Sequence, residues 1–137
     1  MRESETMTTM RKISEICHDL NVGLCYSGGA TVSPFVGEDA PSVGYMIGGV
    51  VEELVLTTHE TLTVPNLNTW LSDIVPNLTF NHYVGAWHDE RTGNVHFDVS
   101  LLQVSRSHAI RIARHRGELA IYDLAAGETI YVDDMQD

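Results

Sequence analysis

Residues 83–117 read YVGAWHDERTGNVHFDVSLLQVSRSHAIRIARHRG, and this stretch decides the fold. Its first part predicts two strands, 83–88 and 94–104, joined by a turn that ends on Gly93. Glycine supplies the left-handed backbone that such a hairpin loop needs. Along the second strand, apolar and polar residues alternate, so one face of the hairpin is expected to be buried and the other polar.

The polar face of this hairpin carries the candidate catalytic residues. A common three-residue loop with a bulge at the glycine would place His88 opposite His96, next to Asp98, and would place Trp87 beside Phe97 on the buried face. Two imidazoles and a carboxylate are enough for an acid–base pair or a metal site, because histidine titrates near neutral pH. An ordinary solvated strand face explains the same alternation. No known metal-binding motif accompanies these residues, so we expect no metal and no cofactor.

The second part of the stretch predicts a helix over 106–116. Ser105 is typical of a helix N-cap, and Gly117 is typical of the residue that follows a helix end. The helix carries four of the chain's eight basic residues and no acidic one. Its arginines either pair with the surrounding acidic surface or simply face water. Alternatively, they recognise an acidic partner surface or a phosphate-bearing molecule. The candidate binding residues are Arg106, His108, Arg111, Arg114 and His115. We also expect the hairpin's Trp and Phe to pack on this helix.

The rest of the chain predicts a small α+β domain with an antiparallel meander and a C-terminal β-hairpin-α-β unit. Apolar spacing indicates helices from Thr9 to Asn21 and from Pro65 or Asn66 to Val75. A two-residue hairpin turn is expected at Gly48-Gly49. The predicted strands are 22–26, 31–36, 43–47, 50–56, 119–124 and 128–132, within a single domain 9–133 that follows a flexible leader 1–8 and precedes an acidic tail 134–137.

Composition excludes several classes of protein. The chain has 137 residues and a formal net charge of -11 at pH 7. Binding of extended duplex DNA is therefore not expected, because phosphate contacts need many basic residues on one face. The sequence has neither a membrane-spanning run nor a secretory signal, so no membrane partner is expected. Cys17 and Cys25 are interpreted as two reduced, partly buried thiols of a cytosolic protein.

Three segments carry a resemblance to a known group of proteins. They are residues 83–100, the helix start at 105–114, and 120–130, which reads AIYDLAAGETI. Together they resemble small uncharacterised accessory proteins encoded by bacteriophages of actinobacteria, over about the last two-fifths of the chain. The resemblance implies a phage origin and a location in the host bacterial cytoplasm. It implies no activity.

These observations favour a non-enzymatic phage accessory protein that binds a host or phage protein through charge complementarity. One alternative is an accessory component of the virion capsid or tail. Another is a small metal-dependent or histidine-dependent hydrolase that uses the three residues on the hairpin's polar face. A symmetric homodimer is compatible with a domain of this size.

Overall fold

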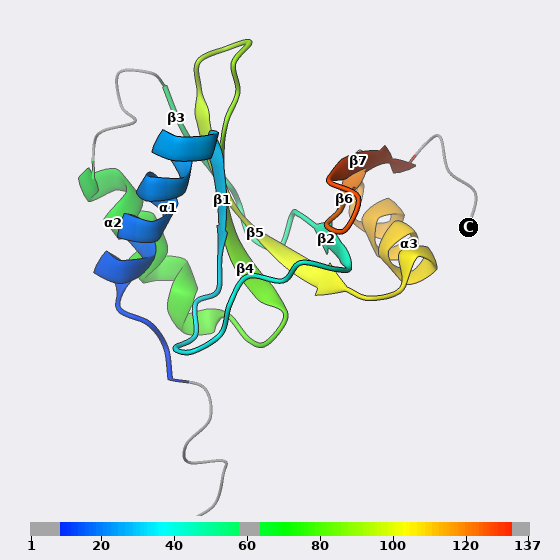
Figure 1. The fold of residues 1–137 in the computed structure, drawn as a ribbon, viewed down its shortest axis with the longest axis horizontal. Helices are drawn as coiled ribbons and strands as arrows, with labels where there is room; N and C mark the ends of the chain where they lie inside the picture. The colour runs from blue at the N-terminus through cyan, green and yellow to red at the C-terminus, as the bar shows by residue number, and fades with distance from the viewer. Residues whose placement is uncertain (1–8, 58–63, 133–137) are drawn as a thin grey trace, which may run out of the picture.

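The computed structural model describes residues 9–57 and 64–132, which form three α-helices and one antiparallel sheet (Figure 1). The helices are α1 (Ile13–Ser27), α2 (Val64–Ile74), which continues as the 3-10 turn Val75–Asn77, and α3 (Arg106–Arg116). The strands are β1 (Gly29–Val32), β2 (Tyr45–Ile47), β3 (Leu54–Leu56), β4 (His82–His88), β5 (Val95–Gln103), β6 (Ala120–Asp123) and β7 (Glu128–Tyr131). The α+β class predicted from the sequence is confirmed.

The sheet has the order β1-β4-β5-β2-β6-β7, and β3 pairs with β5 beside β2. The long strand β5 organises this arrangement, because β4 lies along one of its edges while β3 and β2 share the other. The predicted hairpin at Gly48-Gly49 is therefore wrong. Strands β2 and β3 both run antiparallel to β5, and the connection between them passes from one end of β5 toward the other. Only Gly49 of the two glycines has a positive φ.

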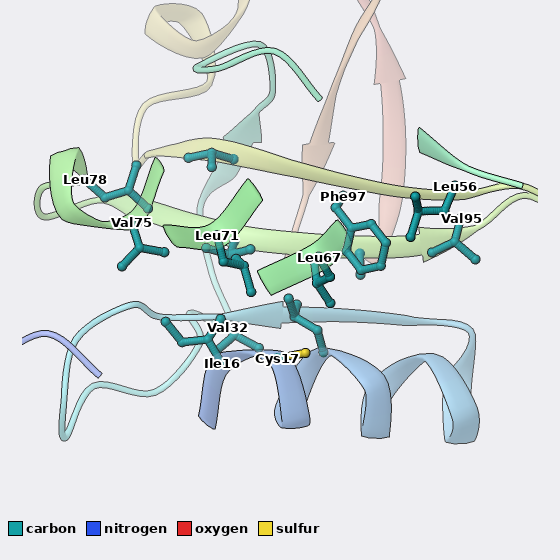
Figure 2. Packing of buried hydrophobic residues seen from close by; sticks show 14 residues of the cluster. Ile16, Cys17, Val32, Leu56, Leu67, Leu71, Val75, Leu78, Val95 and Phe97 are labelled. Atoms are coloured by element: carbon teal, nitrogen blue, oxygen red, sulfur yellow. The ribbon is translucent and has the colours of Figure 1, made fainter. Parts of the chain in front are cut away.

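The larger hydrophobic core lies between the β1–β4–β5–β3 part of the sheet and the helices α1 and α2. Every second side chain along a strand points to the same face of the sheet. Val95, Phe97 and Val99 of β5 therefore all face the helices. Figure 2 shows Ile16 of α1 and Leu71 of α2 directed into this layer. Trp70 of α2 contacts Phe97, and their ring centroids lie 6.4 Å apart. This distance is within the range of about 4.5–7 Å that is usual for aromatic pairs.

A smaller core anchors α3 to strands β2 and β6. Its buried members are Ile47, Ala109, Ile110, Ala113, Ile121 and Val132. Ile47 is paired with Leu101 of β5, and directly opposed residues of an antiparallel pair lie on one face. Because that face continues to Val99 and Phe97, all three helices pack on the same side of the sheet. The expectation that the hairpin packs its Trp and Phe on α3 is wrong, since Phe97 belongs to the core with α1 and α2.

The first helix is longer than predicted. It begins after Lys12 and runs through residues 22–26, where the sequence predicts a strand. The apolar stripe explains this, because Leu24 lies one turn beyond Leu20 and packs against the same core. Gly28 then ends the helix in a left-handed conformation, with its N–H donating to the carbonyl of Leu24.

The other helix boundaries agree with the sequence. Helix α2 and the Pro-containing turn after it match the prediction, and α3 spans the predicted residues. Ser105 caps α3 by accepting a hydrogen bond from the His108 N–H, and Gly117 adopts the left-handed C-terminal conformation. Cys17 is buried, Cys25 is exposed, and both are free thiols. Within 9–57 and 64–132, no helix is long and apolar enough to cross a membrane. The leader 1–8 and tail 134–137 lie outside the described residues.

Candidate functional site

The hairpin exists as predicted, but its strands pair one residue out of the expected register. His88 lies opposite Val95, and Trp87 lies opposite His96. The loop causes the difference. The Asp89 N–H donates to the Asn94 carbonyl at 2.8 Å, so the strands close around four loop residues instead of three. A slip of one residue moves every side chain of one strand to the other face, so the predicted meeting of His88 with His96 does not occur.

The observed register places His96 against the indole of Trp87. The two rings are stacked, with centroids 4.4 Å apart and an interplanar angle of 10°. Nδ1 of His96 lies 3.3 Å from Oε1 of Glu53, which reaches it from the segment before β3. The imidazole is therefore held on two sides, by a ring and by a carboxylate. Trp87 remains 44% exposed.

Asp98 follows His96 on the same face of β5, and two glycines make room for its carboxylate. A Cβ on Gly85, its partner across the strand pair, would lie 2.9 Å from Oδ1. A Cβ on Gly48 would lie 3.3 Å from Oδ2. Within the part of the chain that the structure describes, no hydrogen bond or ion pair reaches this carboxylate. Small residues thus create the space around Asp98 without supplying a donor to it.

The surroundings of Asp98 are acidic. The pKa of its carboxyl is raised to about 6, chiefly by burial and then by the negative charges of Glu53 and Glu118, while His96 has an opposing effect. Glu118 lies just after α3 and comes close to the Gly48-Gly49 segment. A like charge and a partly dry environment both disfavour the ionised form of a carboxyl. A carboxyl shifted in this way, in a concave site, is a recognised marker of a functional position.

These residues line a groove on the face of the sheet opposite the helices. One cavity of about 560 Å³ lies over β1, β4 and β5, and a second of about 590 Å³ extends toward the start of β6. Asp98 and Trp87 line both, so the two cavities are parts of one groove. The side chains shared by both cavities are Met46, Trp87, Asp98, Ser100, Tyr122 and Thr129. The groove combines aromatic and apolar walls with a carboxylate, the usual composition of a ligand-binding cleft.

The five candidate binding residues of α3 all face solvent. Arg106, His108, Arg111, Arg114 and His115 are exposed, whereas Ala109, Ile110 and Ala113 hold the helix on the sheet. Two arginines of this helix also contact the protein's own backbone. Arg114 Nη2 donates to the Val132 carbonyl at 3.2 Å, and Arg116 Nη1 lies 3.5 Å from the Gly48 carbonyl. The helix therefore presents a basic surface, while one of its arginines reaches the rim of the groove.

The two predicted histidines lie on opposite faces of the hairpin. Across residues 9–57 and 64–132, no group of three or more His, Cys, Asp or Glu side chains is placed to hold a metal ion. His96 is directed to Glu53, and His88 is on the other side of the strand pair, so the two imidazoles cannot act on one substrate. The groove offers an accessible aromatic wall and a carboxylate that receives no hydrogen bond from the described residues.

Comparison with known proteins adds no assignment. No protein-family model matches the chain, and no curated protein or solved structure is significantly similar to it.

Sequence reasoning found Asp98 but missed most of the groove. Glu53 and Glu118 come from segments far from the hairpin in the sequence, and only the pairing of β3 and the turn after α3 brings them near. Gly85 was the available signal, because a glycine inside a strand often marks a close approach of another group. Its position opposite Asp98 follows from the register alone.

Proposed function

We propose that this protein is a non-enzymatic accessory protein that binds another protein, and that helix α3 is the surface that makes the contact. The proposal includes a phage origin and a partner from the host or the phage in the bacterial cytoplasm. That origin is supported by the resemblance of residues 83–130 to phage-encoded proteins.

The observation that carries the proposal is the division of α3 into two faces. Its small and apolar residues pack on Ile47 and Ile121, and its basic residues are all exposed. A helix fixed in this way presents its side chains at defined spacing without a large loss of backbone entropy on binding. The chain as a whole carries a net charge of -11, so this basic surface differs in sign from most of the protein. Such contrast favours selective, oriented association with an acidic partner.

Site-specific crosslinking in cells tests this proposal. A photoreactive amino acid at Arg111 should give one discrete protein adduct, identifiable by mass spectrometry, whereas the same group at Lys12 should not. Lys12 is also basic and exposed, but it lies before α1. The charge-reversing change Arg114→Glu should weaken the adduct formed from position 111, because it removes a basic side chain one turn away. A protein with no adduct specific to α3, or with adducts of equal yield from both positions, would contradict the proposal.

A further inference from the structure

The groove on the open face of the sheet is separate from the exposed side of α3 and has the opposite charge. Its carboxylates come from three elements: Glu53 before β3, Asp98 on β5 and Glu118 after α3. Arg116 contacts its rim, where its guanidinium is engaged with the Gly48 carbonyl. Negative groups therefore outnumber positive ones among the described residues that line or touch the groove.

The walls of the groove are aromatic and apolar. Trp87 lines it from β4, Met46 from β2 and Tyr122 from β6. The indole of Trp87 is already stacked on His96 on one side, which fixes its orientation, yet 44% of the residue stays exposed. A fixed indole next to a carboxylate attracts a cation through its ring as well as through the charge.

We propose that this groove binds an extended peptide segment of a partner protein that carries an arginine, with the guanidinium directed to Asp98 and Trp87. Arginine fits the two features together, because its planar group stacks on aromatic rings and donates two parallel hydrogen bonds to a carboxylate. The partner would supply hydrogen-bond donors to Asp98, which receives none from residues 9–57 and 64–132. The ligand proposed for the groove is a basic segment, because the groove is acidic. It differs from the acidic surface that is proposed to bind the exposed side of α3.

The volume and shape agree with a peptide side chain and its neighbours. Each of the two connected cavities is within the range of about 300–1,000 Å³ that ligand pockets occupy. The glycines at 48 and 85 accommodate the Asp98 carboxylate at the floor of the groove, because a Cβ at either position would crowd its oxygens.

The test is an NMR titration of the isotope-labelled full chain with three capped peptides, acetyl-Thr-Val-X-Val-Thr-amide, in which X is Arg, Gln or Glu. The chain has two tryptophans, which give separate indole signals. Trp87 lines the groove, whereas Trp70 donates its indole N–H to the Glu52 carbonyl and packs on Phe97. The Arg peptide should shift the Trp87 signal in a saturable way, with a smaller change at Trp70. The Gln peptide should bind at least about tenfold more weakly, which corresponds to about 1.4 kcal/mol.

Two variants and a control complete the experiment. Asp98→Asn should abolish the preference for Arg over Gln, and Glu118→Gln should reduce it. Glu90→Gln removes a carboxylate from the exposed hairpin loop and should leave binding unchanged. The proposal is overturned if no peptide gives a saturable shift, if Arg and Gln peptides bind equally, or if Asp98→Asn keeps the preference in a protein whose spectrum shows it to be folded. None of these outcomes depends on whether α3 has a partner.

Discussion

Replacing Asp98 with Asn should make the protein more stable at neutral pH. The carboxyl has a pKa of about 6 in the folded protein, against an ordinary value of 3.8. Ionising it is therefore harder in the folded state than in the unfolded chain. The free energy of unfolding is unaffected by this carboxyl below its ordinary pKa of 3.8. It falls as the pH rises from about 4 to about 6, and the loss stays constant above that. An amide in the same place does not ionise, so it avoids the penalty.

The size of the effect follows from the two pKa values. The difference between about 6 and 3.8 corresponds to about 3 kcal/mol, because each tenfold change in an equilibrium constant is worth about 1.4 kcal/mol. Asp98 keeps some contact with water, which reduces the penalty, and we expect a gain of about 1–2 kcal/mol at pH 8. No loss of a hydrogen bond offsets this gain, since none reaches the carboxylate from the described residues.

Urea unfolding at two pH values measures this directly. At pH 8 the midpoint of Asp98→Asn should lie above that of the unchanged protein, and at pH 4 the two midpoints should nearly coincide. Glu90→Gln is the control for removal of a carboxylate, and its midpoint should change little because Glu90 is exposed. A loss of stability in Asp98→Asn at pH 8 would refute the reasoning, because it would mean that the charged carboxylate has a stabilising partner.

Three further changes test the surroundings of the groove and its support. Gly85→Ala should destabilise the protein by about 1–3 kcal/mol, since its Cβ would lie 2.9 Å from Asp98 Oδ1, and the loss measured by urea unfolding should be smaller when Asp98 is also replaced by Ala. Ser105→Ala removes the N-cap of α3 and should cost about 1 kcal/mol in thermal unfolding, with Ser107→Ala as a control without that backbone bond; equal losses would argue against the cap. Leu71→Ala, in the fully buried core of α2, should cost about 2–5 kcal/mol by the same measurement, and a cost below about 1 kcal/mol would contradict the packing described.

The sequence predicted those elements whose local signals and tertiary packing agree. Helix α3 has a serine cap, a glycine stop and an apolar stripe, and its bounds were correct. For α1 the sequence predicts an end at Asn21, because local preference favours a strand over residues 22–26. In the fold, Leu24 contributes to the core on the helix side, and this tertiary contact outweighs the strand preference.

The candidate site depended on a single register, which the sequence could not settle. A loop of three residues and a loop of four both place glycine near the end of the turn. The difference comes from Asp89, whose side chain accepts a hydrogen bond from the Arg91 N–H and whose carbonyl accepts one from the Gly93 N–H. These contacts favour the longer loop, and they move Trp87 from the expected core to the groove.

An NMR pH titration of the side-chain carboxyl carbon of Asp98, in the full chain, tests the central claim most directly. A midpoint near 6 would agree with a partly buried carboxylate that shares its groove with Glu53 and Glu118. A midpoint at or below 3.8 would show that the carboxylate is well solvated or already neutralised, and the groove described above would then lack its defining charge.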